Sequence, residues 1–230
     1  MEDFDVPIEF ELAGWALFMA ELEVAHEGAN QLSSLRETVT AKVRENRTLE
    51  TLSSDPTVAG LRRLFRAAGC DPTRYRPASE ALLRRLLKGS EMPAIHPLVD
   101  LNNCLSATLA VPCCVMAAGT FEPPYVLRAG RPGESYASLR GPFNLEGKPL
   151  LVDALGPCDA PITGSQRVKV TAETERATLV AYLPAEVLTW EMVLASLEDL
   201  LAGGPVAHIY AAGGAGAPTT RASTARDQDR

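Results

Sequence analysis

The sequence predicts an α+β fold, with helices concentrated in the first half of the chain and short strands in the second. Between residues 32 and 88, apolar side chains recur every three or four positions, as they do on the buried face of a helix. Beyond Gly119, short apolar runs alternate with Gly and Pro, which is typical of strands joined by turns. We therefore expect a small mixed or antiparallel sheet with helices packed against it.

The N-terminal segment predicts one or two strands. Residues 5–13 alternate apolar and acidic side chains, as a half-buried strand does, and Gly14 allows the chain to turn. The alternation resumes at residues 21–24. The apolar run between these segments fits a strand, although residues 16–23 also fit a helix.

Three helices are predicted next. The first covers residues 32–47, where Leu35, Val39 and Val43 are spaced by four. The second begins at Asp55 and Pro56, a capping residue followed by proline in the first turn, and it ends at Gly69. The third covers residues 77–88 and ends at Gly89.

The C-terminal half predicts strands at residues 125–128, 133–136, 150–155, 167–171 and 178–182, a helix at 186–202 and a last strand at 206–210. From residue 211 onward no periodic apolar face exists to offset the entropy lost on ordering. We therefore expect a single domain over residues 1–210 and a disordered tail over residues 211–230.

Composition excludes several classes of protein. The formal net charge of −7 argues against holding nucleic acid through bulk charge, so DNA is not an expected partner. No apolar run approaches the roughly 20 residues that span a bilayer, and the N-terminus is acidic where a signal peptide is basic. A cytoplasmic protein without a membrane partner is expected.

Cofactor and metal chemistry are not expected. The chain contains no Gly-rich phosphate loop, no dinucleotide-binding fingerprint and no Gly-X-Ser-X-Gly motif. Its five cysteines include no Cys-X-X-Cys pair, and its three histidines lie far apart in the sequence. The cysteines are therefore interpreted mainly as small buried apolar residues.

Residues 90–114 form the stretch around which the chain is organised. Pro93 and Pro97 are expected to exclude a helix from its first part, and Asp100, Asn102 and Asn103 follow as a group of short polar side chains. A short helix is predicted over residues 104–110, ended by a proline at position 112.

A cationic segment precedes this stretch. Residues 61–90 contain eight cationic side chains against two acidic ones, a local charge of +6. The run fits either a solvated helix face or a surface that binds phosphate groups. The cationic residues are Arg62, Arg63, Arg66, Arg74, Arg76, Arg84, Arg85 and Lys88.

The order Pro-Ala-Ile-His-Pro-Leu-Val-Asp-Leu-Asn-Asn at residues 93–103, followed by a short helix and Pro112, resembles the B3/B4 domain. This is the editing domain of the bacterial phenylalanyl-tRNA synthetase β subunit, and it also exists as a stand-alone protein. Residues 61–89 are similar to the helix, turn and helix of the stand-alone members. The resemblance implies a B3/B4-like mixed sheet with flanking helices, and it favours the phosphate-binding interpretation of the cationic segment, with the aminoacyl-tRNA acceptor end as partner.

The three polar residues of the central stretch have two interpretations that are compatible with each other. Asp100, Asn102 and Asn103 can cap the following helix, or they can line a pocket that holds an amino acid. The resemblance implies that Asn103 faces the editing pocket, whereas Asn102 replaces the threonine that is usual there. His96, between Ile95 and Pro97, is interpreted as a structural or surface residue.

Cys114 takes the position of a pocket histidine in the synthetase, with Cys113 beside it. The two thiols can be inert packing, or they can recognise a substrate or attack an ester if their pKa is depressed. The cationic segment is expected to depress it.

Residues 156–164 resemble the glycine-containing loop on the opposite wall of the family's pocket, which makes Gly156 and Asp159 candidate substrate-binding residues. Thr174 is similar to a threonine before the following strand of the family. The acidic residue with which the synthetase recognises a phenol falls near Val180, so a pocket tuned to tyrosine is not expected.

The resemblance implies a trans-acting aminoacyl-tRNA deacylase, a hydrolase that cleaves the ester of mischarged tRNA, with Asn103 and Cys114 as catalytic candidates. In the family, backbone amides, pocket polar groups and the ribose hydroxyl position the water, which suits a chain without a catalytic triad. Two alternatives remain open: a transferase or cyclase that uses a pocket cysteine on an aminoacyl group taken from tRNA, and a non-catalytic tRNA-binding module.

Overall fold

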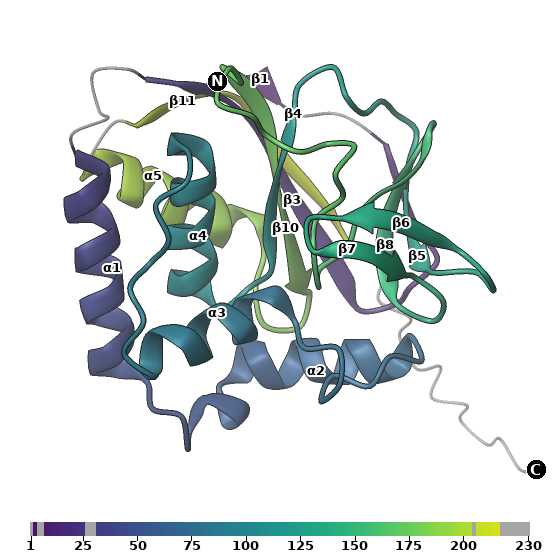
Figure 1. The fold of residues 1–230 in the computed structure, drawn as a ribbon, viewed down its shortest axis with the longest axis horizontal. Coiled ribbons are helices and arrows are strands. Elements are labelled where there is room, and N and C mark those ends of the chain that lie inside the picture. The colour runs from purple at the N-terminus through teal and green to yellow at the C-terminus, as the bar shows by residue number, and fades with distance from the viewer. Residues whose placement is uncertain (1, 4–6, 26–30, 204–205, 217–230) are drawn as a thin grey trace, which may run out of the picture.

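The computed structural model describes residues 2–3, 7–25, 31–203 and 206–216. A five-stranded sheet runs through the middle of the molecule, with helices on one side and a second sheet on the other (Figure 1). Its strand order is β1-β11-β3-β10-β4, and all neighbouring pairs are antiparallel except β1 with β11. The strands are β1 (Glu2–Asp3), β11 (Ala207–Gly216), β3 (Trp15–Val24), β10 (Arg176–Pro184) and β4 (Cys113–Ala117). Strand β4 therefore forms one edge of this sheet.

Strand β3 explains why the apolar run near the N-terminus lacks a strict alternation. Ala16, Phe18 and Ala20 pack in the cluster on the helical side of the sheet. Leu17 and Met19 pack in the cluster on the other side. Because both faces of the strand are buried over residues 15–20, this part of the sequence is continuously apolar. The structure resolves the ambiguity between strand and helix in favour of strand.

Four helices provide most of the helical side chains in the cluster on the helical side of the sheet, and Leu52 and Val58 from two further helices join them. Helix α4 contacts both α1 and α5, and α1 contacts α3 (Figure 1). The four are α1 (Leu32–Asn46), α3 (Ala78–Leu87), α4 (Pro97–Leu109) and α5 (Trp190–Ala202). None of the helices among the described residues has the length and apolar character needed to cross a membrane.

The second cluster joins the central sheet to a four-stranded sheet of order β2-β5-β8-β9. Helix α2 (Pro56–Ala67), which follows the short helix η2 (Leu52–Ser54), adds Leu61 and Phe65 to this cluster. The sheet strands are β2 (Ile8–Phe10), β5 (Tyr125–Ala129), β8 (Pro149–Asp153) and β9 (Gly156–Asp159), and the separate hairpin is β6 (Ser135–Ser138) with β7 (Gly141–Asn144).

The structure confirms the predicted α+β fold, a mixed sheet with flanking helices. Helices α1, α2 and α3 lie where the sequence predicts them. The Asp55 carboxylate accepts hydrogen bonds from the Thr57 and Val58 amides at 3.0 and 3.3 Å, so the predicted cap of α2 is present.

The prediction for the central stretch is wrong at the start of the helix. Helix α4 begins at Pro97, not at residue 104, because proline occupies the first helical position, where its missing N–H costs nothing. The His96 Nδ1 accepts a hydrogen bond from the Leu98 amide at 3.2 Å, so His96 has the structural role that was predicted. Asp100, Asn102 and Asn103 consequently lie inside the helix and do not precede it.

Four further predictions need correction. Residues 167–171 form turns and irregular structure in place of a strand, and the helix predicted from residue 186 begins at Trp190. Of the predicted strand at residues 5–13, only Ile8–Phe10 is extended within the described part. Strand β11 continues to Gly216, paired with β3, so the predicted tail boundary at residue 211 is too early. The rest of that tail, residues 217–230, lies outside the described residues.

Candidate active site at the edge strand

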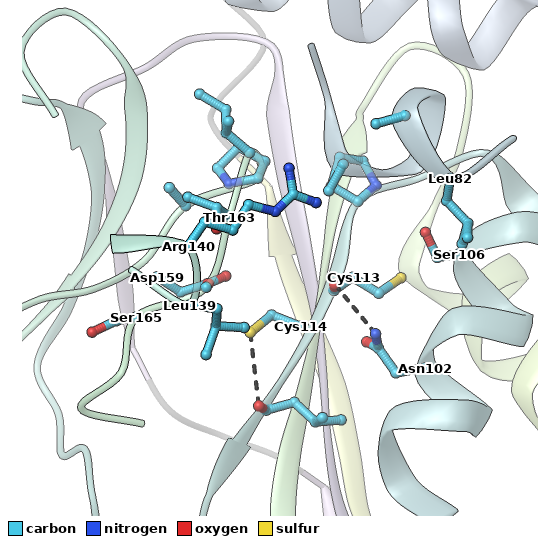
Figure 2. A pocket seen from close by; sticks show the side chains of 18 of the residues that line it. Leu82, Asn102, Ser106, Cys113, Cys114, Leu139, Arg140, Asp159, Thr163 and Ser165 are labelled. Atoms are coloured by element: carbon cyan, nitrogen blue, oxygen red, sulfur yellow. Dashed lines mark hydrogen bonds between the residues drawn. The ribbon is translucent and has the colours of Figure 1, made fainter. Parts of the chain in front are cut away.

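A cavity of about 730 Å³ lies beside the edge strand β4. Cys113 and Cys114 of β4 stand between two walls, with Asn102 and Ser106 of α4 on one side and Asp159 and neighbouring residues on the other (Figure 2). A volume of this size is typical of pockets that enclose a small organic ligand.

The pairing of β4 determines which of its backbone groups face the cavity side. The Tyr182 amide donates to the Pro112 carbonyl at 2.9 Å. Backbone groups two residues apart in a strand point the same way, so the backbone N–H and C=O of Cys114 also point toward β10. The groups of Cys113 and Val115 then point to the free edge. Asn102 Nδ2 indeed donates to the Cys113 carbonyl at 3.4 Å. Val115 is among the lining residues, and its backbone amide is directed to the same free edge.

Helix α4 supplies the first wall. Asn102 and Ser106 are four residues apart and share one helix face. The Ser106 hydroxyl donates to the Val111 carbonyl at 2.7 Å, which anchors the helix to the segment that leads into β4. Asn103 also lines the cavity, and its side chain makes no hydrogen bond within the part of the chain that the structure describes. Its amide is therefore available to a ligand.

The second wall consists of Asp159, the last residue of β9, and the segment that follows it, residues 160–166. The Tyr136 hydroxyl donates to the Thr163 carbonyl at 2.5 Å, and the Leu139 amide donates to the Gly164 carbonyl at 3.0 Å. The Ala78 amide at the start of α3 donates to the Pro161 carbonyl at 2.9 Å. Hydrogen bonds from the hairpin and from α3 thus hold this wall opposite α4.

Asp159 is the only acidic residue among the described residues that line the cavity, and it is fully buried. The Tyr182 hydroxyl donates to its Oδ2 at 2.6 Å, whereas its Oδ1 has no hydrogen-bond partner within the described part of the chain. Burial raises the pKa of the Asp159 carboxyl to about 7, while the bond from Tyr182 and weaker contacts from the Cys114 thiol and the Ala160 amide oppose this shift. The carboxyl is therefore poised to change protonation near neutral pH.

The two cavity thiols are held in their protonated form. Burial raises the pKa of both Cys113 and Cys114, and the Asp159 carboxylate raises it further by repelling a thiolate. The prediction that the cationic segment depresses the thiol pKa is therefore wrong, because the desolvated site and the adjacent carboxylate outweigh the more distant cations.

The rim of the cavity is cationic. Among the described lining residues five carry a positive charge, and four of these are exposed. They come from both walls: Arg74, Arg76 and Arg85 from the side of α3, and Arg140 and Lys169 from the opposite side. The cavity thus combines a positive rim with an acidic residue in its fully buried part.

A family model described as the B3/4 domain matches residues 60–190. The chain belongs to the B3/4 domain family. The matched region includes α3, α4, β4 and β9, so it covers every element that builds the cavity walls. The resemblance drawn from residues 93–103 is thereby confirmed.

Among solved structures, the chain is similar to an N-terminal fragment of the phenylalanyl-tRNA synthetase β subunit from Pyrococcus horikoshii, with 14% sequence identity and a TM-score of 0.44. The similarity covers 91% of this chain and 51% of that one, so the chain spans about half the length of the fragment. No curated protein sequence matches the chain.

Within this B3/4 domain, the structure brings five predicted site residues to one cavity: Asn102, Asn103, Cys113, Cys114 and Asp159. Asp100 lies elsewhere, because its Oδ1 accepts the Ile95 amide at 2.8 Å and its Oδ2 accepts Arg36 at 2.5 Å. Asp100 therefore stabilises the start of α4 and is not among the lining residues.

Gly156 and Thr174 are also outside the cavity lining. Gly156 opens β9 with a φ of 116°, and its carbonyl accepts a hydrogen bond from Arg167 at 3.2 Å. Thr174 closes a turn, where its hydroxyl accepts the Thr171 amide at 2.9 Å. Both residues shape the backbone around the cavity without reaching it.

The eight cationic residues predicted to bind tRNA divide into groups. Arg74, Arg76 and Arg85 line the cavity. Fully buried Glu80 holds Arg84 at 2.9 Å, Arg76 at 3.6 Å and Arg62 at 3.7 Å, so one carboxylate organises three guanidinium groups. The exposed Arg63 pairs with Glu186, and Arg66 and Lys88 are exposed and lie outside the lining.

Sequence reasoning missed Tyr182, Arg140 and Lys169, and it also missed Ser106 and Val115, which lie on elements beside the predicted residues. Tyr182 is two residues beyond Val180 on β10, and both pack in the same cluster, so strand alternation was a usable signal. Arg140 and Lys169 lie in loops, and no local sequence pattern predicts that these loops lie beside the cavity. Among the described residues, no group of three or more His, Cys, Asp and Glu side chains is arranged to hold a metal ion.

Proposed function

We propose that this B3/4 domain binds the aminoacylated 3′ end of a tRNA and hydrolyses the ester that joins the amino acid to the terminal ribose. The observation that carries the proposal is the polarity of the cavity, which has a cationic rim and a buried part lined by Asn102, Asn103 and Asp159. An aminoacylated tRNA end is polarised in the matching sense, with phosphates on one side of the ester and the amino acid on the other. Membership of the B3/4 domain family is consistent with such a ligand.

The cavity is large enough for this ligand. Its volume of about 730 Å³ falls in the range of pockets that enclose ligands of several hundred daltons. The phosphates would lie at the rim near Arg85 and Arg140, where backbone contacts give affinity without selecting a base. The net charge of −7 makes this attraction local to the rim.

Hydrolysis in this cavity would rely on positioned donors. As water attacks the ester carbonyl, negative charge develops on the carbonyl oxygen, and a fixed backbone amide stabilises that charge. The Val115 amide faces the free edge of β4, and the Asn103 amide group has no competing hydrogen bond among the described residues. These two groups are the proposed donors, and positioning alone can contribute a large rate effect for an activated ester.

The thiols favour hydrolysis over transfer to the enzyme. A cysteine attacks an ester as the thiolate, and burial with the Asp159 carboxylate raises the pKa of both cavity thiols. Cys114 is therefore proposed to shape the cavity beside the ester, with water as the nucleophile.

The proposal also covers the number of domains and the location of the activity in the cell. The described residues are proposed to form one domain, because the two apolar clusters share strands β3 and β10. A tRNA substrate also places the activity in the cytoplasm.

Deacylation of a panel of correctly and incorrectly charged aminoacyl-tRNAs tests the proposal, with the released product identified by mass. We expect free amino acid from a narrow subset, with the rate lowered by at least tenfold in Asn103→Ala and less in Cys114→Ala. Asn46→Ala is the matched control, because Asn46 is also a helical asparagine but is exposed at the C-terminal end of α1.

Two outcomes contradict the proposal. Hydrolysis that never exceeds the uncatalysed rate, although tRNA binds, would indicate a binding module. A cyclised or transferred product that disappears in Cys114→Ala would indicate the cysteine-dependent alternative.

A further inference from the structure

Among the residues that the structure describes, two buried hydrogen-bond acceptors at the cavity have no partner. Asp159 Oδ1 is one, on a fully buried residue, and Asn102 Oδ1 is the other, on a residue that is 6% exposed. Both residues line the cavity, from opposite sides of β4 (Figure 2). Buried polar atoms in folded proteins are nearly always hydrogen-bonded, so two unpartnered acceptors in one cavity indicate a missing donor.

The other polar atom of each side chain, Asp159 Oδ2 or Asn102 Nδ2, already makes a hydrogen bond. This bond fixes the direction in which the free Oδ1 atom points. Tyr182 donates to Asp159 Oδ2 at 2.6 Å, and Asn102 Nδ2 donates to the Cys113 carbonyl at 3.4 Å. Rotation of either side chain to move its free oxygen would break the hydrogen bond that the side chain already makes. The Cys114 thiol contacts the Asp159 carboxylate and is directed to the Val115 carbonyl at 3.7 Å, but a thiol is only a weak donor.

The distribution of charge over the lining residues favours one orientation of a charged ligand in the cavity. Four of the five cationic lining residues are exposed and Arg76 is partly buried, whereas Asp159, the single acidic residue among the described lining residues, is fully buried. A protonated amine is therefore repelled at the rim and attracted to Asp159, whereas a phosphate experiences the opposite preference.

We propose that Asp159 and Asn102 form a donor-recognition subsite, which selects aminoacyl groups that present an N–H or O–H donor to one or both of the free oxygens. This inference rests on the proposed function, because it specifies which aminoacyl groups the same cavity accepts. Two parts of an aminoacyl ester carry such donors: the α-ammonium group and a protic side chain. An aliphatic or phenyl side chain leaves both acceptors unpaired, and a site built to bond a donor discriminates strongly against an analogue that lacks it.

Binding of non-hydrolysable probes tests the subsite without requiring turnover. The probes are 3′-aminoacylamino-3′-deoxyadenosines, in which an amide replaces the ester. Three near-isosteric side-chain pairs form the first arm: threonine with valine, tyrosine with phenylalanine, and glutamine with methionine. The second arm compares the valine probe with its N-acetyl derivative, which removes the charge of the α-ammonium group.

If the side chain supplies the donor, the protic member of at least one pair binds roughly 10- to 100-fold more tightly than its partner. If the α-ammonium group supplies it, N-acetylation weakens binding by a similar factor. In either case Asp159→Asn abolishes the difference, because Tyr182 keeps the amide oxygen as its acceptor and the NH₂ group then faces the cavity. Asn102→Leu reduces the difference, and Asp199→Asn, an exposed site on α5, leaves it unchanged.

Equal binding within all three pairs together with no effect of N-acetylation overturns the inference, and so does the absence of binding by every probe. A preference that persists in both Asp159→Asn and Asn102→Leu overturns it as well, provided that thermal unfolding shows both variants to be folded. These outcomes are separate from the deacylation test, since the probes cannot be hydrolysed: a donor preference without deacylation supports the subsite and refutes the hydrolase.

Discussion

The Tyr182 hydroxyl donates a hydrogen bond of 2.6 Å to Asp159, which joins strand β10 of the central sheet to the end of β9 across the buried part of the cavity. Both residues are fully buried. The bond holds one carboxylate oxygen and leaves the other free, so it controls both the orientation and the protonation of the only acidic lining residue among those described. The first two predictions follow from this pair.

Tyr182→Phe should raise the pKa of Asp159 above its value of about 7, because the hydrogen bond from Tyr182 stabilises the carboxylate. The variant should also lose roughly 1–3 kcal/mol of unfolding free energy, since Oδ2 is then buried without a partner. Titration of the carboxyl carbon by NMR measures the pKa. Tyr125→Phe is the control and should leave the Asp159 titration unchanged; a pKa that falls in Tyr182→Phe contradicts the assigned role.

Asp159 should make the fold less stable as the pH rises from 4 to 8. The pKa of its carboxyl is about 7 in the folded state against 3.8 as the ordinary value, so the folded state binds more protons over this interval. Its contribution is therefore fully present below pH 4 and lost as the pH rises through 7, by at most about 4 kcal/mol.

Urea unfolding at pH 5 and pH 8 measures this loss. Asp159→Asn should flatten the decline and should be more stable than the wild type at pH 8, whereas Asp199→Asn, at an exposed position, should keep the wild-type slope. An unchanged pH dependence in Asp159→Asn would show that the carboxyl does not titrate near neutrality.

Arg85→Ala and Arg140→Ala should weaken tRNA binding to a similar extent whatever amino acid is attached. Both side chains line the rim, and each phosphate contact to a single strand contributes roughly 0.7 to the slope of log affinity against log salt concentration. Affinity measured between about 50 and 200 mM salt should show a slope reduced by roughly that amount in each variant. Arg63→Ala is the control, because Arg63 is exposed but pairs with Glu186 away from the lining; equal effects in all three variants would contradict a rim-specific contact.

Alkylation should distinguish protonated thiols from a reactive thiolate. Since the pKa of Cys113 and of Cys114 is raised, iodoacetamide at pH 8 should modify both much more slowly than it modifies a free thiol. Peptide mass spectrometry over time measures the two rates separately, with the urea-unfolded protein as the reference. Rapid labelling of Cys114 in the folded protein would contradict a raised thiol pKa and would support the transferase interpretation.

Several features of the fold were predictable because their signals are local. Asp55 and Pro56 predict the start of α2 through capping and a fixed φ, and no distant residue is needed for either effect. Pro97 shows where a local signal is ambiguous. The same residue excludes a helix that would run through it and suits the first turn of a helix that begins at it, and the structure shows the second case.

The candidate site was predicted in part. The motif at residues 93–103 located Asn102 and Asn103 near the cavity, and the segment at 156–164 located Asp159. Asp100 shows the other outcome, because its neighbours in space, Arg36 on α1 and the Ile95 amide, engage its carboxylate. Whether a polar helical residue faces a ligand or a neighbouring helix depends on packing that its own segment does not encode.

By itself the sequence determined the fold class, the positions of α1, α2 and α3 and the family, because periodicity, capping residues and motif order are properties of contiguous segments. Only the tertiary structure decided which polar residues share a cavity and in which protonation state they stand. The thiol pKa shows the reason: the sequence places cations near Cys114, but burial and the Asp159 carboxylate, 45 positions away in the chain, set the result. Desolvation and Coulomb interactions depend on distance in space, and folding alone brings those groups together.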